Sequence, residues 1–348
     1  MPGCRVGCEG PEVQPVDCRR SSCGGSVSDT RRQKTVTSIR EARPSRRGVL
    51  AGGLGVALAA VPMMASTACA SEPREAAARQ PRDDAARQLR DLEREHGARL
   101  GVFGWNTVTG ASVSHRGDER FPMCSTSKTP AVGAVLRDLD HDGTFLSKII
   151  HYTERDIERS GGAPVTGRPE NLAQGMSVAD LCGAAISYSD NTAVNLLLAE
   201  LGGPTAVTRF CRSIKDPVTR LDRWEPELNS AEPGRVTDTT SPRAIGKTYA
   251  RLALGNALAA ADRKLLTGWL LANTTGDKRL RAGLPGNWRV ADKTGTGSYG
   301  TANDVGIAWP PGQGPIVLSV LTTRPDADAE ADDLLIARAA TVLATALA

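Results

Sequence analysis

The spacing of apolar side chains changes twice along the chain after residue 84. Residues 101–121 alternate apolar and polar side chains around a short turn, which predicts two strands. From residue 126 to about residue 273 the spacing is mostly helical. The clearest helical stretches are residues 177–189, 191–203 and 204–214. Strand-like segments joined by Gly/Pro turns then follow at residues 288–296, 300–311 and 314–324, and an amphipathic helix closes the chain at residues 332–348.

Strands therefore lie at both ends of this region, with helices between them. The simplest fold joins the two ends in one sheet, covers that sheet with the terminal helices and leaves the middle as a helical lobe. We expect an α+β fold with one lobe from residues 85–123 and 276–348 and an all-helical lobe from residues 124–275. The first helix is expected near Asp84, after a charged, Ala-rich linker at residues 71–84. A cleft between two lobes is a natural place for a site.

The first 70 residues predict a leader rather than a folded domain. Arg46 and Arg47 precede a charge-free stretch, residues 48–70, which is rich in Gly and Ala and ends in a small-x-small pattern. This arrangement resembles a twin-arginine signal peptide with an over-long N-terminal extension. We expect recognition by the twin-arginine export machinery, a secreted or periplasmic location and no stable membrane span after processing. Lipid attachment through Cys69 remains open.

Charge is unevenly distributed along the chain. The formal net charge is +4, but residues 1–70 hold ten of the 43 Lys/Arg and five of the 39 Asp/Glu. The remaining 33 basic and 34 acidic residues leave the body near neutral. Nucleic-acid binding needs a concentrated basic face, so we expect no nucleic-acid partner. A small-molecule substrate and a monomer are the expectation.

Within residues 125–136, three small hydroxyl residues and Lys128 stand ahead of an apolar run. If a helix begins at Ser125, the three-residue step to Lys128 places the lysine amine on the same face as the serine hydroxyl. The simpler interpretation is an N-terminal cap, because serine is common there. Alone, this S-x-x-K motif is weak support for a nucleophile.

Two further short motifs follow in the chain. Ser189 and Asn191 belong to S-D-N, between two helical stretches, where a cap or turn is the simpler interpretation. Lys293, Thr294 and Gly295 form K-T-G at the end of a strand-like segment, where glycine lets a substrate approach the backbone. The three motifs in this order are the set known from class A β-lactamases and penicillin-binding proteins.

A fourth stretch separates these two families. Residues 222–229, DRWEPELN, resemble the omega loop of class A serine β-lactamases, with its deacylating glutamate at Glu225. Penicillin-binding proteins generally lack this loop. From about residue 85 onward the chain resembles a class A serine β-lactamase, which implies the β-lactamase/D,D-peptidase-like fold, an antiparallel sheet flanked by terminal helices plus an all-helical lobe. The implied activity is hydrolysis of penicillins and cephalosporins, which confers β-lactam resistance and needs no cofactor or metal.

The resemblance also implies catalytic roles. Ser125 would be the nucleophile, with Lys128 beside it, and Ser189 would pass a proton to the departing nitrogen with support from Lys293. Glu225 would activate the hydrolytic water. Whether Lys128 or Glu225 takes the proton of Ser125 is left open.

Substrate-binding roles follow in the same way. Asn191 would bond the acylamide side chain of the drug, and Asn229 would help to hold the water. The backbone amides of Ser125 and Thr296 would form the oxyanion hole. The carboxylate of the drug would meet the cationic end of the K-T-G strand. Its expected partners are Lys293, Thr294, Gly295, Thr296 and Arg279.

The omega loop itself carries three further matches. Arg223 and Asp238 occupy positions that form an ion pair across the neck of the loop in the family. The bond between Glu225 and Pro226 matches a cis peptide, which proline makes accessible. These residues would be structural.

Cysteine positions depart from some relatives. Cys124 precedes the nucleophile, but Gly297 stands where carbapenem-hydrolysing relatives have its disulfide partner. Cys182 likewise faces Val132 instead of a cysteine. Neither disulfide is expected, and carbapenem hydrolysis is left open.

Other functions remain as alternatives. A D,D-peptidase would use the same serine acylation, and a non-hydrolytic β-lactam sensor would stay acylated. A zinc-dependent lactamase is disfavoured because the four histidines, at positions 96, 115, 141 and 151, form no ligand motif. A Ser-His-Asp hydrolase is disfavoured because no G-x-S-x-G motif surrounds Ser125.

Overall fold

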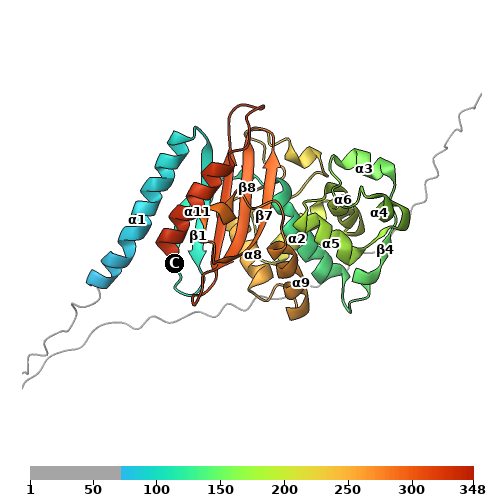
Figure 1. Ribbon diagram of the computed structural model, residues 1–348, viewed down its shortest axis with the longest axis horizontal. Coiled ribbons are helices and arrows are strands. Elements are labelled where there is room, and N and C mark those ends of the chain that lie inside the picture. Colours follow the sequence, from blue (N-terminus) through green and yellow to red (C-terminus); the bar gives the residue numbers. More distant parts are fainter. Residues whose placement is uncertain (1–71) are drawn as a thin grey trace, which may run out of the picture. The chain divides into compact units, whose positions relative to one another are not determined.

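A five-stranded antiparallel sheet forms the centre of the fold (Figure 1) in a computed structural model, which describes residues 72–348. The strand order is β2-β1-β9-β8-β7, so strands from the two ends of the chain pair directly between β1 and β9. The predicted α+β fold with one sheet built from both ends is confirmed. The strands are β1 (Arg99–Asn106), β2 (Ser112–His115), β7 (Arg289–Gly297), β8 (Thr301–Trp309) and β9 (Ile316–Thr323).

Helices cover both faces of this sheet. On one face, Leu318 of β9 packs with helices α1 (Glu72–Glu95) and α11 (Asp333–Leu347), which lie together in Figure 1. On the other face, the neighbouring Val317 packs against α8 (Pro242–Ala253). Successive strand residues point to opposite faces, and both faces here are buried, so residues 316–321 of the strand are apolar apart from Ser319.

Helix α1 differs from the sequence-based expectation. It runs back to Glu72, so the linker predicted at residues 71–84 is helical from residue 72 onward. Ala, Glu, Gln and Arg are strong helix formers and fill this stretch, although Pro81 lies inside the helix. Composition alone had suggested a linker because the segment is charged.

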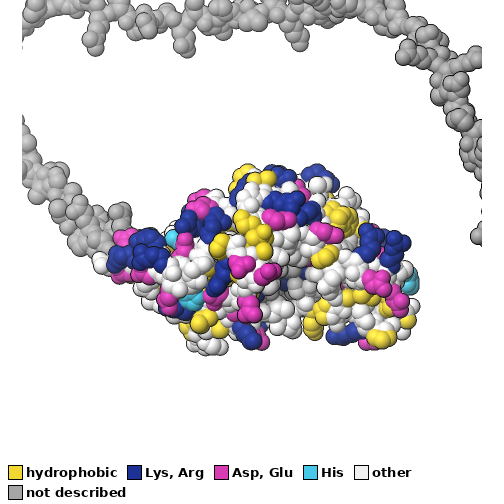
Figure 2. Space-filling view, turned by 90° about the horizontal axis from the view of Figure 1, so that it is seen from above, with side chains coloured by type: hydrophobic (Ala, Val, Ile, Leu, Met, Phe, Trp, Pro, Cys, Tyr) yellow, Lys and Arg dark blue, Asp and Glu magenta, His cyan; other side chains and the backbone are white. Residues whose placement is uncertain are grey.

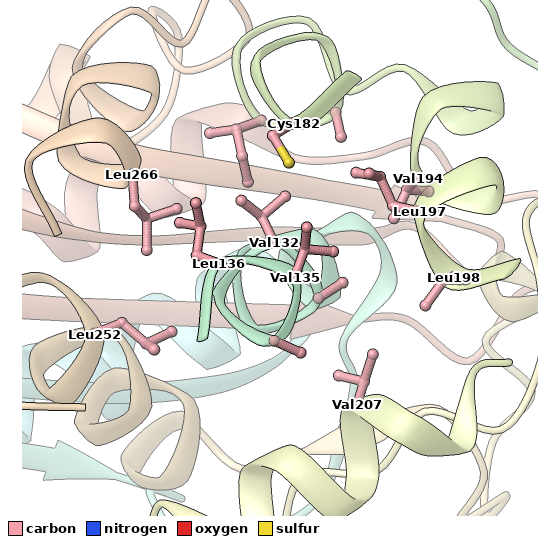
Figure 3. Packing of buried hydrophobic residues seen from close by; sticks show 14 of the residues in the cluster. Val132, Val135, Leu136, Cys182, Val194, Leu197, Leu198, Val207, Leu252 and Leu266 are labelled. Carbon is pink, nitrogen blue, oxygen red and sulfur yellow. The ribbon is translucent and has the colours of Figure 1, made fainter. Parts of the chain in front are cut away.

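The middle of the chain packs around helix α2 (Lys128–Ala134), whose seven residues are all buried. Figure 3 shows the side chains of Val132, Val135 and Leu136 surrounded by apolar side chains of neighbouring helices. This packing fixes the segment that carries Ser125. The other helices are α3 (Glu154–Ser160), α4 (Pro169–Gln174), α5 (Val178–Ser187), α6 (Asn191–Glu200), α7 (Thr205–Ser213), α9 (Ala260–Leu271) and α10 (Leu280–Gly283).

Four two-residue strands form small pairs outside the main sheet. They are β3 (Phe121–Pro122) with β6 (Thr239–Thr240), and β4 (Ile149–Ile150) with β5 (Met176–Ser177). The region from 124 to 275, predicted to be all-helical, therefore contains three short strands. Two residues are too few to show a strand period in the sequence.

Charged side chains of both signs lie on the surface of the described region (Figure 2). Figure 2 shows basic and acidic side chains interspersed over one face, in line with a near-neutral body. Within residues 72–348, no helix has the length and apolar character needed to cross a membrane. The predicted leader, with Arg46, Arg47 and Cys69, lies outside the described residues.

Candidate active site

Ser125 lies in a short 3-10 helix, Cys124–Ser127, that continues into α2. The preceding Cys124 has a φ of 46°, a left-handed conformation that non-glycine residues adopt at a cost. Such strain persists only where the surroundings fix the backbone. Here the Tyr249 hydroxyl, fully buried, donates to the carbonyl oxygen of Thr126 at 2.9 Å.

The ammonium of Lys128 is fully buried and meets the predicted nucleophile. Its Nζ donates to Ser125 Oγ at 3.0 Å and to Asn191 Oδ1 at 2.6 Å. It also donates to the carbonyl oxygen of Ser189 at 2.8 Å and lies 3.1 Å from Glu225 Oε1. A buried ammonium is tolerated only when it is paired and hydrogen-bonded, and all its partners here are predicted site residues.

Ser189 has a left-handed backbone conformation, which is uncommon for a residue other than glycine. Its φ is 57°, and it stands directly before Asp190, the N-cap of α6. The buried Asp190 carboxylate accepts from the backbone of Ala193, Val165 and Thr166 and from the Thr166 hydroxyl, at 2.8 to 2.9 Å. This carboxylate anchors Ser189 and Asn191 on either side.

Glu225 is buried and shares its two carboxylate oxygens between different partners. Oε1 accepts from Ser125 Oγ at 3.4 Å and faces Lys128, while Oε2 accepts from the Asn229 amide. The carboxylate therefore spans the space between the nucleophile and the loop. A water molecule held by Glu225 and Asn229 would lie beside Ser125.

The omega-loop features expected from the resemblance are present. Arg223 Nε donates to Asp238 Oδ2 at 2.5 Å, and the bond from Glu225 to Pro226 is cis. Asp238 Oδ1 also accepts from the backbone amides of Asp222 and Arg223, at 2.7 and 3.0 Å. The buried Asp238 carboxylate thus closes the neck of the loop.

Asn195, which no sequence motif marks, holds Glu225 in place. Its side chain accepts from the backbone N–H of Glu225 at 3.0 Å and donates to the carbonyl oxygen of Glu225 at 2.9 Å. Asn195 lies four residues after Asn191 on α6, and such residues share a face. That spacing was the available signal, but the partner is 30 residues away in sequence.

Strand β7 brings the K-T-G residues to the nucleophile. A Cβ atom on Gly295 would lie 2.9 Å from the Met123 carbonyl oxygen and 3.2 Å from the Ser125 amide nitrogen. Only glycine allows this approach of two backbones. The exposed Thr296 follows on this edge strand, beside the segment of Ser125, which supplies the other predicted oxyanion-hole amide.

The side chain of Arg279 contacts the end of strand β7 that carries the K-T-G residues. Its guanidinium donates to Thr296 Oγ1 and to the carbonyl oxygens of Gly295 and Asn303, each at 2.8 Å, and to Asp333 at 2.7 Å. The side chain is almost fully buried. It lies next to the predicted carboxylate-binding residues, as expected.

Asn303 was not predicted from sequence and joins this strand edge to the nucleophile. Its buried amide donates to the carbonyl oxygens of Pro122 and Met123 at 2.9 and 3.2 Å. The segment that leads to Ser125 is thereby tied to β8. No short motif marks such a residue.

Lys293 is fully buried, and its hydrogen bonding differs from the expectation that it supports Ser189. Burial, together with the Lys128 ammonium, lowers the pKa of Lys293 to about 7. Its hydrogen bond goes to the carbonyl oxygen of Thr294 at 3.0 Å, whereas the Ser189 hydroxyl accepts from Lys128 at 3.3 Å. Ser189 is thus hydrogen-bonded to Lys128, although support from Lys293 was expected.

The three cysteines of the described region, Cys124, Cys182 and Cys211, are free and buried. The absence of the two family disulfides agrees with the sequence. Burial raises the pKa of each thiol, so none is a thiolate near neutral pH.

The fold and the site together define a class of protein. The Ser125 hydroxyl contacts the buried Lys128, and the Glu225 carboxylate reaches both this hydroxyl and the Asn229 amide. This arrangement suits a hydrolase that works through a serine acyl-enzyme, in which a second step releases the acyl group.

Comparisons with known proteins identify the family. Residues 84–347 match the Beta-lactamase enzyme family. The β-lactamase of Streptomyces fradiae is 62% identical over 306 residues, covering 88% of this chain and 98% of that protein. The β-lactamase of Streptomyces lavendulae is 61% identical over 306 residues, with the same coverage. The chain belongs to the β-lactamase enzyme family and is a class A serine β-lactamase.

Solved structures agree with this assignment. The β-lactamase from Streptomyces albus G is similar with a TM-score of 0.76 and 63% identity, over 76% of this chain and 100% of that one. An ancestral class A β-lactamase is similar with a TM-score of 0.71 and 52% identity, over 74% of this chain and 98% of that one. The comparisons give no support to the alternatives of a D,D-peptidase or a non-hydrolytic sensor.

Proposed function

We propose that this enzyme opens the β-lactam ring of penicillins and cephalosporins in two steps, with the residues described above in defined roles, and that it thereby confers β-lactam resistance. The observation that carries the proposal is the contact of one buried ammonium, Lys128, with both Ser125 Oγ and Glu225 Oε1. This contact links Ser125, the proposed nucleophile for acylation, to Glu225, the proposed base for deacylation.

In the first step, Ser125 Oγ attacks the lactam carbonyl carbon. The hydroxyl proton passes through water to Glu225, or to the amine of Lys128 once the ammonium has given a proton to Glu225 Oε1, 3.1 Å away. The oxyanion is stabilised by the backbone amides of Ser125 and Thr296. The carbon–nitrogen bond then breaks, and Ser189 delivers a proton to the departing nitrogen and takes one from Lys128, whose Nζ lies 3.3 Å from the Ser189 hydroxyl.

In the second step, a water between Glu225 and Asn229 attacks the ester. Glu225 takes the proton of the water, and Ser125 leaves as the alcohol after it regains a proton. The products are the free enzyme and a ring-opened acid.

Binding of the drug uses the remaining residues. Its carboxylate meets Lys293, Thr294 and Thr296, with the Arg279 guanidinium directly behind Thr296. Asn191 offers its amide to the acylamide side chain. Carboxylate recognition by buried cations is strong because little water screens them.

Intact-mass measurements over time test these roles. The wild-type enzyme mixed with benzylpenicillin should show a short-lived adduct while the drug gains one water. Glu225→Gln should accumulate the adduct, and Ser125→Ala should show neither adduct nor product. Rapid hydrolysis by the Ser125→Ala variant would refute the assignment of the nucleophile.

The location and state of the enzyme are also proposals. We infer export by the twin-arginine machinery on the basis of Arg46 and Arg47 and the apolar stretch that follows them. Replacement of both arginines by lysine should leave the activity in the cytoplasmic fraction. Mass spectrometry of the exported protein would reveal a lipid on Cys69, and light scattering should give a monomer mass.

We also propose a functional division of the body into two lobes. Residues 85–123 and 276–348 supply the K-T-G strand and its cations, and residues 124–275 supply Ser125, Ser189 and Glu225. The substrate would bind where these two groups of residues meet.

A further inference from the structure

A second cavity, of about 590 Å³, opens beside the omega loop and contains none of the proposed catalytic residues. One wall is the segment 231–236, which lies within the omega loop between Arg223 and Asp238, and another is the end of β9 with Thr323 and Pro325. Pro122, three residues before the nucleophile, also lines it. Small-molecule sites in proteins have about this volume, roughly 300–1,000 Å³.

The walls of this cavity carry more positive than negative charge. The charged lining residues are Arg99, Arg120, Arg235, Arg324, Glu119 and Glu232. Arg99 pairs with Glu119 at 2.7 Å and Arg235 with Glu232 at 2.6 Å. Two arginines remain beyond these pairs.

The guanidinium groups of these two arginines are only partly satisfied by ion pairs and hydrogen bonds. Arg324 pairs with Asp332, outside the cavity, through one terminal nitrogen, while its buried Nε has no hydrogen-bond partner. Arg120 donates to the Val218 carbonyl oxygen at 3.0 Å and to the Thr239 hydroxyl at 3.1 Å. No acidic side chain of residues 72–348 lies within ion-pair distance of Arg120.

The remaining lining is apolar and partly exposed. Val236 has 52% of its surface exposed, and three prolines, Pro122, Pro233 and Pro325, also line the cavity. Guanidinium groups bind carboxylates and phosphates through paired hydrogen bonds, and apolar walls favour an apolar body on the same ligand.

We propose that this cavity is a binding site for a small organic anion, in which a carboxylate or phosphate meets Arg120 and Arg324 and an apolar body covers Val236. The site is separate from the β-lactam site and does not depend on the proposed catalytic roles.

A ligand here would contact the omega loop at residues 231–236. The Ser230 hydroxyl donates to Glu232 at 2.6 Å and accepts from Arg223 at 2.8 Å, and Arg223 holds the loop neck through Asp238. An anion bound at Arg120 and Arg324 would repel the Glu232 carboxylate, which lines the same cavity, and would change this chain of contacts. Binding should therefore alter the deacylation rate without competing with the substrate.

Calorimetric titration of the folded enzyme with phenyl phosphate, at low salt and pH 7.5, tests the proposal. We expect saturable binding that Arg120→Gln weakens about tenfold or more, because a charge-assisted pair is lost. Arg120→Lys keeps the charge and should retain part of the affinity. Arg155→Gln, the same charge change on the exposed surface of α3, is the matched control and should leave binding unchanged.

Three outcomes would overturn the proposal. They are no binding at millimolar phenyl phosphate, equal weakening by Arg155→Gln and Arg120→Gln, and purely competitive inhibition of nitrocefin hydrolysis that is insensitive to Arg120→Gln. The last result would place the anion in the β-lactam site. Sodium benzoate as a second probe distinguishes carboxylate from phosphate recognition.

Discussion

The hydrogen bonds between the Asn195 side chain and the Glu225 backbone predict slower deacylation in the Asn195→Ala variant. This variant loses two hydrogen bonds, of 3.0 and 2.9 Å, to the backbone of the residue proposed to activate water. A net hydrogen bond contributes about 0.5–1.5 kcal/mol, which gives roughly 1–3 kcal/mol for the pair. Asn195 lines a cavity of about 520 Å³, and water there can replace part of the lost hydrogen bonding. We therefore expect a loss in the lower half of this energy range.

A loss of about 1–2 kcal/mol in the deacylation transition state slows that step roughly 5- to 30-fold. We expect the adduct with benzylpenicillin to persist correspondingly longer in Asn195→Ala, as measured by quenched-flow intact mass. Asn195→Asp keeps the acceptor but places a carboxylate against the Glu225 carbonyl oxygen, and should be slower still. Asn256→Ala, in an exposed loop, is the control for handling and folding.

The acylation rate in the same experiment separates the two possible bases. If Lys128 takes the Ser125 proton, acylation by Asn195→Ala stays close to wild type while deacylation falls. If Glu225 does so through water, both rates fall together. An unchanged adduct lifetime in a variant with a wild-type unfolding midpoint would refute the view that Asn195 positions Glu225.

Three further predictions follow from burial and close contacts. Since the pKa of Lys293 is lowered to about 7, the unfolded chain binds more protons between pH 7 and about pH 10. This group's contribution to stability should therefore rise with pH there, by at most about 1.4 kcal/mol per unit, and Lys293→Met should lack that rise in denaturant titrations at pH 7.5 and 9.5. Asp190→Ala leaves four donors without their buried acceptor and should lower the free energy of unfolding by about 3–5 kcal/mol, while an equal midpoint in a thermal melt would contradict this. Gly295→Ala forces a Cβ against the backbone beside Ser125, so kcat should fall at least tenfold, and a nitrocefin assay with an unchanged kcat would show that the strands can separate.

Long periodic segments and short motifs were predictable from sequence, whereas local exceptions were not. The helices and the paired strands of the main sheet repeat over many residues, and each motif lies within a few positions. The start of α1 at Glu72 was missed because charge and helix propensity point in different directions there. The two-residue strands were missed because they exist only through their partners.

The supporting residues of the site illustrate the same limit. Asn195 and Asn303 act through contacts to backbone atoms that are far away in sequence. An asparagine on a helix or strand has no distinguishing neighbour until the fold brings that backbone close. Family resemblance could place Glu225, since its loop has a recognisable sequence, but the residue that fixes Glu225 required the three-dimensional arrangement.

The charges of the site suggest why a carboxylate belongs in its substrate. Three cations, Lys128, Lys293 and Arg279, are buried around one strand edge and the nucleophile. Lys128 faces Glu225 and Arg279 faces Asp333, but the pKa of Lys293 is lowered because burial outweighs the carboxylates near it. The empty site is therefore short of negative charge at Lys293. In the proposed binding mode the carboxylate of the drug would supply that charge and favour the protonated lysine, so the same burial that lowers the pKa of Lys293 in the free enzyme would strengthen its recognition of a carboxylate.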